Sequence, residues 1–373
     1  MEPGQTATAY SLMVISIPLI LQPLAPEPFS LNAPVFPSAT LERDRTLHSL
    51  PLNFTLEGMT AEKRVLILLG PTAVGKTGVS LLLAEHLETE IISADSMQIY
   101  RGMDIGTAKP SPEERDRIRH HMIDIADPDE TFSAGRYVDM VKAVIAGLHK
   151  EERIPLIVGG TGLYIRTLTR GIFEAPEADR ALRKRFHDTE ERNPGTLYGK
   201  LQELDPKRAE EVHPTDMRRI IRALEVIVKT KRPMSELQRE LTTPLPYSFI
   251  KIGLTRERGE LYRIIEERVD EMFAAGLVEE VRRILRSNPA DTPLQAIGYK
   301  EVVDYLNGSR DLDEVKWLVK RATKRYAKRQ YTWFRKERDI HWVDITGVTE
   351  HDELLKRLME IRELKKLSSG NLV

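Results

Sequence analysis

The chain has 373 residues, of which 30% are charged and 41% apolar, a composition typical of a globular protein long enough to bury a large core in about two domains. The formal net charge of −1 excludes an overall electrostatic attraction to nucleic acid, so any such attraction must come from a local cluster of cations. The absence of cysteine excludes disulfides, cysteine-ligated zinc and thiol catalysis, and we expect a protein of the reducing cytoplasm.

Residues 1–58 differ from the rest of the chain. Their apolar run, Tyr10–Leu24, is too short and too often broken by proline to span a membrane as a helix, and we expect no membrane partner. A signal peptide carries positive charge ahead of its apolar stretch, whereas the first cation here is Arg43. We interpret residues 1–58 as a disordered or wrongly annotated extension, with Met59 as the true first residue. A cleaved targeting peptide is the alternative.

Residues 64–69 form a continuous apolar run of strand length, as expected for a strand buried on both faces of a parallel sheet. Apolar residues at helical spacing predict a helix from Lys76 onward. The segment between this strand and this helix fits the P-loop pattern G-x-x-x-x-G-K-[ST] in full: Gly70, Pro71, Thr72, Ala73, Val74, Gly75, Lys76 and Thr77.

The chemistry of a phosphate site explains these residue types. The two glycines let backbone N–H groups converge on phosphate oxygens, and the helix N-terminus adds its dipole. Lys76 supplies a positive charge, and the Thr77 hydroxyl can hold Mg²⁺. The pattern identifies a phosphate ligand but no reaction. Because most P-loop proteins use ATP or GTP, a nucleotide-binding kinase or NTPase is the default interpretation.

Polar residues follow two further predicted strands. Residues 90–93 lead into Asp95, and residues 154–158 lead into a glycine-rich turn that contains Thr161. In a doubly wound sheet the carboxyl ends of neighbouring strands face one crevice, so we expect these residues near the P-loop. A carboxylate there could hold Mg²⁺ or accept a proton from an incoming nucleophile.

A segment between prolines, residues 176–246, has helical character and separates the strand at 154–158 from an apolar strand at 249–254. We therefore predict an α/β fold with a P-loop NTPase-like core and a parallel sheet, plus an inserted all-helical domain. The core comprises residues 59–175 and 247–373, with C-terminal helices that end in one at Glu353–Leu367.

Residues 316–338 contain ten Lys or Arg and one acidic residue, Glu337. Lysines recur every four residues from Lys316 to Lys328, with Arg321, Arg325 and Arg329 beside them, so these cations would form one basic stripe on a helix. Since a solvated helix face is normally mixed in sign, this stripe predicts a polyanion partner. The aromatic residues between the cations could stack on bases, but we interpret most of them as core contacts.

Several segments together resemble the tRNA dimethylallyltransferases, the tRNA isopentenyltransferase family. The resemblance runs from about residue 63 to residue 344 and rests on GPTAVGKT, SADSMQIYRGMDIGTAKP, HHMIDIADPDETFSAGRY, RIPLIVGGTGLYI, HPTDMRRIIRALEV and AKRQYTWFR. Residues 1–58 have no counterpart, and the absence of cysteine matches the bacterial type, which lacks a zinc finger. The resemblance implies transfer of a dimethylallyl group from its diphosphate to N6 of the adenosine 3′ of a tRNA anticodon, at position 37.

For individual residues, the resemblance implies that the P-loop holds the leaving diphosphate. Asp95 would accept the proton of the attacking amine or orient it, and Thr161 would contact the target base or its backbone. Arg268 would reach the diphosphate, although a helical arginine beside two glutamates is more often a surface ion-pair member. The target base would have to leave its stack to reach the site.

The resemblance also implies a set of tRNA contacts. Residues 176–246 become a helical tRNA-binding domain, although several of their arginines could equally be ordinary solvated side chains. The segment Pro293–Tyr299 matches a further tRNA-contacting segment, without an independent physical reason. The residues expected at the tRNA are Asp95, Ser96, Met97, Gln98, Thr161, Arg183, Arg218, Arg219, Arg222, Lys328, Arg329, Gln330, Trp333 and Arg335.

The leading hypothesis is a monomeric tRNA prenyltransferase with Mg²⁺ as cofactor and with a tRNA anticodon loop and dimethylallyl diphosphate as partners. A P-loop small-molecule or nucleotide kinase that uses ATP is the first alternative. An RNA-binding P-loop protein without catalysis is the second, and Asp95 argues against it because passive binding needs no carboxylate beside a phosphate site.

Overall fold

A computed structural model describes residues 63–364 of the chain. Our interpretations of residues 1–58 and of Met59 therefore lie outside the described residues. The same holds for the end of the predicted terminal helix, which is matched by α15 (His351–Met359) over its first part.

Six strands form one sheet in the order β3-β2-β4-β1-β5-β6, and every neighbouring pair is parallel. The predicted parallel sheet is thus confirmed, and the four predicted strands match observed ones to within a residue or two, whereas β3 and β6 have no counterpart in the prediction. The strands are β1 (Arg64–Leu69), β2 (Ile91–Ser93), β3 (His120–His121), β4 (Leu156–Gly159), β5 (Ser248–Thr255) and β6 (Ile340–Asp344).

The central strand β1 is buried on both faces, as its apolar run predicts. Val65, Ile67 and Leu69 pack with α3 (Ala134–Lys150) and α4 (Gly162–Arg170). Leu66 and Leu68 point the other way and pack with α1 (Lys76–His86) and α15. Helices therefore cover both faces of the sheet, which leaves its carboxyl edge as the place where loops from several strands meet.

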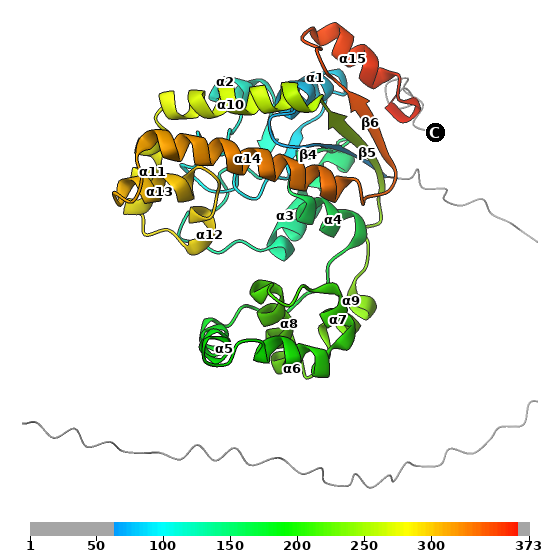
Figure 1. The fold of residues 1–373 in the computed structure, drawn as a ribbon. Coiled ribbons are helices and arrows are strands. Elements are labelled where there is room, and N and C mark those ends of the chain that lie inside the picture. Colours follow the sequence, from blue (N-terminus) through cyan, green and yellow to red (C-terminus); the bar gives the residue numbers. More distant parts are fainter. Residues whose placement is uncertain (1–62, 365–373) are drawn as a thin grey trace, which may run out of the picture. The chain divides into compact units, whose positions relative to one another are not determined.

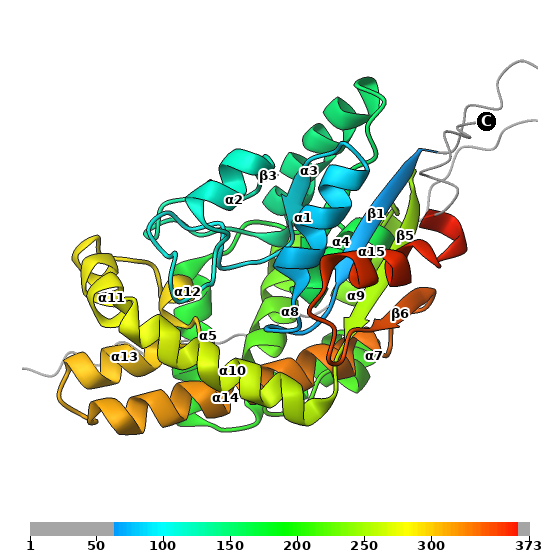
Figure 2. The ribbon, with the colours of Figure 1, turned by 90° about the horizontal axis from the view of Figure 1, so that it is seen from above.

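The C-terminal helices form a separate apolar cluster. In it, Val269 of α10 (Arg258–Ala274) and Val319 of α14 (Leu312–Phe334) pack with Ile99 and Met103, which follow β2. Helices α10 and α14 lie side by side in both ribbon views (Figures 1 and 2). The cluster fixes the loop after β2 against helices that are distant in sequence. The remaining helices outside the insertion are α2 (Pro112–Arg117), α11 (Leu277–Arg286), α12 (Asp291–Leu294) and α13 (Tyr299–Leu306).

Between α4 and β5 the chain forms five helices with an apolar core of their own, which we call the helical insertion. Leu197, Leu201 and Leu224 are among its fully or almost fully buried residues. Its entry and exit meet where a side chain at Gly171 would collide with the Thr243 carbonyl. The predicted helical character is confirmed, while the assignment as a separate domain stays a prediction. The helices are α5 (Arg180–Arg192), α6 (Thr196–Leu204), α7 (Pro206–Glu211), α8 (Met217–Thr230) and α9 (Met234–Leu241).

A buried carboxylate, Glu225 of α8, ties the insertion together. It accepts hydrogen bonds from the Asp179 backbone at 2.6 Å, from the Arg183 guanidinium at 3.0 and 2.8 Å, and from Arg222 at 2.5 Å. Burial by itself would raise the pKa of Glu225, but these hydrogen bonds outweigh it and lower the pKa to about 2. The ionised carboxylate is therefore the form that holds α5 to α8.

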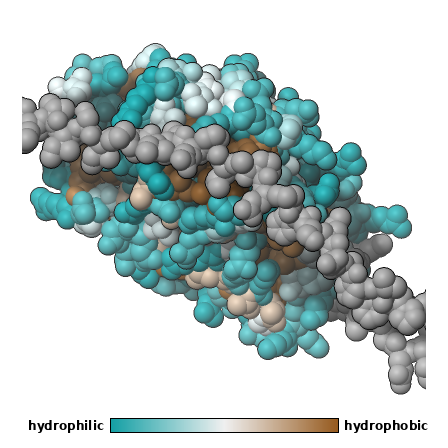
Figure 3. All heavy atoms as spheres, turned by 90° about the horizontal axis from the view of Figure 1, so that it is seen from below, coloured by the Kyte–Doolittle hydropathy of each residue, from teal (hydrophilic) through white to brown (hydrophobic). Residues whose placement is uncertain are grey.

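The surface gives no sign of a membrane segment in residues 63–364, since no helix there is long and apolar enough to cross a bilayer. Hydrophilic residues make up most of the visible surface on the face drawn in Figure 3, with hydrophobic residues in smaller areas between them. Exposed large apolar side chains include Leu163, Leu241 and Trp317.

We expect the free energy of unfolding of the helical insertion to decrease as the pH is lowered, because the ionised form of Glu225 contributes to it. Its pKa is about 2 in the folded chain and 4.5 ordinarily, so its contribution is complete above pH 4.5 and is lost as the pH falls through 2. The loss amounts to about 3 kcal/mol. In Glu225→Gln, amides of α5 and α8 should exchange faster at pH 7, and this difference from wild type should shrink toward pH 2. The exposed Glu210→Gln is the matched control; equal protection in all three proteins at pH 7 would contradict the assignment.

Candidate active site

The P-loop, residues 70–77, joins β1 to α1 at the carboxyl edge of the sheet. Gly75 has a φ of 108°, a left-handed conformation that glycine adopts without strain. The Lys76 ammonium lies along the loop and donates to the carbonyls of Gly70 at 3.0 Å and Pro71 at 2.8 Å. The predicted strand, loop and helix are therefore confirmed, and the binding of a phosphate by this loop stays a prediction.

The loops after β2 and β4 meet at the same edge, as predicted. The Ala94 carbonyl accepts a hydrogen bond from the Thr161 backbone at 3.1 Å, and the Thr161 hydroxyl accepts one from the Ser96 backbone at 3.0 Å. Asp95 is half-buried, and one of its oxygens accepts from the backbones of Met97 at 2.9 Å and Gln98 at 3.4 Å. Within residues 63–364, no side chain or backbone group donates to its second oxygen, so that oxygen can receive a ligand.

Two adjoining cavities share Asp95. The P-loop cavity, of about 300 Å³, is lined by Thr72, Lys76 and Thr77 together with Asp95 and Arg268. The second cavity, of about 290 Å³, also reaches Asp95 and Arg268 but adds an apolar wall. The residues of that wall are Met97, Ile265, Val269, Met272, Ala296, Ile297 and Val319. The pair can thus hold a small apolar group attached to a phosphate-bearing end.

Two half-buried cations face this space. Burial lowers the pKa of Lys76 to about 8, with Asp95 opposing the shift and Arg268 adding to it, so the ammonium is mostly protonated at neutral pH. Burial also lowers the pKa of Arg268, whose guanidinium nonetheless stays charged. Glu266 and Glu267 instead pair with Lys324 and Arg263. Among the described residues Arg268 has no carboxylate within ion-pair distance, so the structure does not support the alternative of an ordinary surface ion pair, and its contact with a diphosphate stays a prediction.

The turn after β4 requires glycines because residues of the loop after β2 and of α14 lie against its backbone. A side chain at Gly159 would overlap the backbone of Ala94, one at Gly160 would overlap Gln330, and one at Gly162 would overlap Trp333. The repeated glycines of this turn were a signal of close packing, but the partner helix α14 could not be identified from them.

Gln330, expected at the tRNA, is buried at 6% exposure between the two loops. Its side-chain oxygen accepts from the Thr72 backbone at 2.8 Å, and its nitrogen donates to the Gly160 carbonyl at 2.9 Å. Gln330 thus links the P-loop to the turn after β4, and any contact with tRNA stays a prediction. Tyr326 of the same helix lines both cavities, and burial, followed by the negative charge of Asp95, raises its pKa.

The basic stripe of α14 is partly neutralised. Lys320 pairs with Asp270 at 2.7 Å, Lys324 pairs with Glu266, and Lys316 lies over the Phe273 ring at 5.8 Å. Two of the four lysines of the stripe therefore face carboxylates of α10, and the prediction of a polyanion partner then depends on the other cations of the stripe.

Other cations of the stripe are exposed. Arg325, Lys328 and Arg329 have no carboxylate within ion-pair distance among the described residues. They line an open groove of about 480 Å³, the basic groove, with Thr332, Trp333 and Lys336. Arg329 also lines the second cavity, so the groove and that cavity share a wall.

The structure places the remaining predicted tRNA residues away from the cavities. Arg183 and Arg222 are held by Glu225, whereas Arg218 and Arg219 are exposed on α8. None of these four lines a described cavity, and neither does Arg335, which is exposed at the end of α14. Their contacts with tRNA stay predictions.

The sequence family and the solved structures agree on what the chain resembles. The model of the family described as IPP transferase matches residues 98–337. A tRNA dimethylallyltransferase of Thermodesulfovibrio yellowstonii is 56% identical over 298 residues, which cover 78% of this chain and 94% of that protein. A tRNA dimethylallyltransferase of Thermotoga maritima is 48% identical, and the match covers 79% of this chain and 98% of that protein.

Among solved structures, the tRNA isopentenylpyrophosphate transferase of Bacillus halodurans is 40% identical, with a TM-score of 0.61 over 83% of this chain and 99% of that one. A eukaryotic dimethylallyltransferase described as acting on tRNA is 27% identical, with a TM-score of 0.67 over 83% and 85% of the two chains.

Proposed function

This chain belongs to the IPP transferase family, and we propose that it transfers the dimethylallyl group of dimethylallyl diphosphate to N6 of adenosine 37 of tRNA, next to the anticodon. The products are N6-isopentenyladenosine and diphosphate. The protein is a transferase, and the alternative of a P-loop kinase is not favoured. The monomeric state and the cytoplasmic location expected from the sequence stay predictions.

One observation carries the proposal: Asp95 stands where the P-loop cavity meets a cavity with an apolar wall. A diphosphate suits the first cavity, and a five-carbon apolar group with an adenine suits the second. A phosphoryl-transfer enzyme would instead need its acceptor close to the phosphates, where an apolar wall offers nothing to a polar acceptor.

The reaction breaks the bond between C1 of the dimethylallyl group and the diphosphate oxygen, and it forms a bond between C1 and N6 of adenine. Negative charge develops on the departing diphosphate, where the P-loop N–H groups, Lys76 and Arg268 stabilise it. N6 loses a proton as the new bond forms, and the open oxygen of Asp95 accepts it. The Thr161 hydroxyl accepts a hydrogen bond from the Ser96 backbone and thereby holds the loop that carries Asp95 in place.

Magnesium fits this site. The Thr77 hydroxyl lines the P-loop cavity at the start of α1, and Asp95 lies across the same space. Residues 63–364 contain no group of three or more His, Asp or Glu that could form a complete metal cage. An ion held by one hydroxyl, substrate phosphates and water agrees with how Mg²⁺ is usually bound, and when present it would neutralise part of the diphosphate charge.

The tRNA would reach the site along the basic groove. Its unpaired cations can contact the anticodon-loop phosphates, and the adenine would leave its stack to enter the second cavity beside Arg329. The exposed Arg218 and Arg219 of the helical insertion are available for a further stretch of the same tRNA.

The direct test is incubation with unmodified tRNA, radiolabelled dimethylallyl diphosphate and Mg²⁺. We expect label in the RNA, at the adenosine 3′ of the anticodon, because the P-loop cavity and the apolar wall together suit a prenyl diphosphate. ATP consumption without labelled RNA would contradict prenyl transfer and support the kinase alternative.

Asp95→Asn should lower kcat by about 10²–10⁴-fold, because an amide cannot accept the proton from N6. The KM for dimethylallyl diphosphate and the affinity for tRNA should change little, since the backbone hydrogen bonds of residue 95 can be kept by the amide oxygen. Asp129→Asn, an exposed aspartate, is the control. Steady-state labelling kinetics decide the matter, and a kcat near that of wild type would show that Asp95 has another role.

Two double variants of α14 test the RNA surface. Arg325→Ala with Lys328→Ala removes two unpaired cations and should weaken tRNA binding, with the slope of log K against log salt reduced by about 1.5. Lys320→Ala with Lys324→Ala removes the same charge from the face paired with α10 and should change the slope less. Filter binding between 50 and 200 mM salt, about the range in which such slopes show, gives both numbers. Equal slopes for the two variants would contradict the assignment of the faces.

A further inference from the structure

Glu280 of α11 is a buried carboxylate that lines neither of the two cavities at Asp95. It is 1% exposed, and its oxygens accept hydrogen bonds from the backbones of Asp104 at 3.0 Å, Ile105 at 2.8 Å and Gly106 at 3.0 Å, and from the Tyr299 hydroxyl. Burying a carboxylate is unfavourable unless donors compensate it, and here four donors converge on it. Three of them belong to one short stretch of backbone.

That stretch continues into the wall of the site. Thr107 and Ala108 line both cavities, as Arg268 does. Ala108 has a φ of 49°, an uncommon conformation that the surrounding structure must hold in place. The carbonyls of Thr107 and Ala108 accept from the Gln98 side chain at 3.3 and 3.2 Å, and the Gln98 backbone donates to Asp95. A chain of contacts thus runs from Glu280 through residues 104–108 to Asp95.

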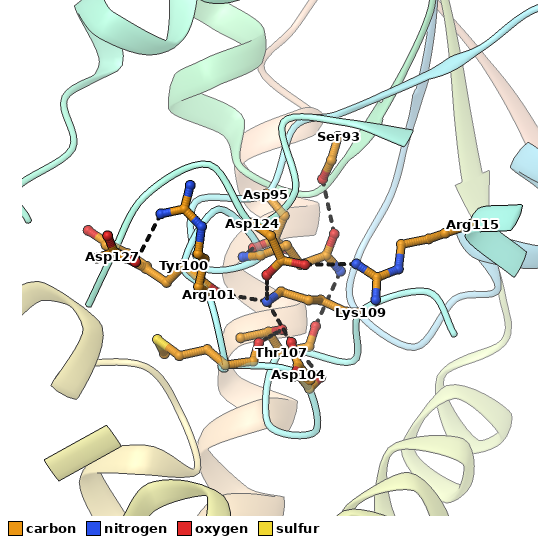
Figure 4. A network of polar contacts seen from close by, with 12 residues as sticks. Ser93, Asp95, Tyr100, Arg101, Asp104, Thr107, Lys109, Arg115, Asp124 and Asp127 are labelled. Carbon is orange, nitrogen blue, oxygen red and sulfur yellow. Dashed lines mark hydrogen bonds and ion pairs between the residues drawn. The ribbon is translucent and has the colours of Figure 1, made fainter. Parts of the chain in front are cut away.

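The far end of the stretch is held separately by Lys109, the centre of the network in Figure 4. Its side chain is 2% exposed, and its ammonium donates to the Tyr100 carbonyl at 2.6 Å and to the carboxylates of Asp104 at 2.7 Å and Asp124 at 2.5 Å. Asp124 is in turn bound by Arg115 at 2.7 Å. These three bonds use all the donors of Lys109, so it has none left for a diphosphate.

Tyr299 gives a physical role to one residue of the segment Pro293–Tyr299, for which the sequence showed a family resemblance but no physical reason. A side chain at Gly106 would overlap the Tyr299 ring, so the ring packs directly on the backbone of the stretch that Glu280 binds. The hydroxyl of the same ring donates to Glu280. Residues 104–106 therefore sit between a ring and a carboxylate that come from α13 and α11.

We propose that Glu280 is a positioning residue, which keeps residues 104–108 in place as the wall that receives the prenyl diphosphate. The proposal rests on the proposed function for the identity of that ligand. A molecule whose wall has shifted cannot bind, so the apparent affinity falls by the fraction of molecules with the wall in place. Every molecule with bound ligand has residues 104–108 in place, so kcat, which is measured at saturating ligand, should not change.

Glu280→Gln tests this directly, because one side-chain oxygen is replaced by an NH₂ group that faces backbone donors. We expect the KM for dimethylallyl diphosphate to rise about tenfold or more, with kcat within about twofold of wild type. Glu279→Gln, on the exposed side of the same helix, should behave as wild type. A mere loss of stability would reduce the number of active molecules and leave KM unchanged, and that result would overturn the proposal.

A second perturbation reaches the same contact from the other side. Gly106→Ala pushes against Tyr299 without removing a charge and should raise the same KM, whereas Gly147→Ala, where a side chain meets open space, should not. This variant decides the proposal if Glu280→Gln does not fold. A normal KM in Gly106→Ala would overturn it.

Hydrogen exchange separates this proposal from the proposed function. If wild type fails to label tRNA, the proposed function is wrong. The backbone amides of residues 104–106 still report on Glu280: exchange at least about tenfold faster in Glu280→Gln than in Glu279→Gln supports the positioning role. Equal exchange rates in the two variants would overturn it.

Discussion

The close approach of α14 to the turn after β4 is the constraint on which the site depends. Gly160 and Gly162 leave room for Gln330 and Trp333, and Gln330 then joins the Thr72 backbone to the Gly160 carbonyl. The P-loop is thereby held by a residue far away in sequence as well as by its own strand and helix. Any side chain on those glycines would separate α14 from the loops and move one wall of both cavities.

The same helix connects the two substrates of the proposed reaction. Its buried face supplies Gln330 and Tyr326 to the cavities, one exposed face supplies the unpaired cations of the basic groove, and a third is neutralised by α10. A helix with this division fixes the distance between the phosphate cradle and the RNA surface. Delivery of an adenine to Asp95 is then a matter of rigid geometry, which suits a reaction between two separately bound ligands.

The fold and the centre of the site could be predicted from the sequence because their signals are local. The P-loop, the strand before it and Asp95 each follow from neighbouring residues, and the parallel sheet then brings them together. Gln330, Glu280 and the pairing of Lys320 and Lys324 could not be predicted, because each depends on a partner in a distant element. A basic pattern in one helix says nothing about the acidic residues of another, so the sequence could not show which cations of the stripe are paired.

The contact between Gly171 and Thr243, where the helical insertion begins and ends, has a consequence for sequence divergence in such a protein. Because the chain leaves and re-enters the core at one point, substitutions and even altered helix lengths within the insertion need not disturb the strands on either side. The part proposed to recognise nucleic acid is thus free to diversify while the chemical machinery is preserved.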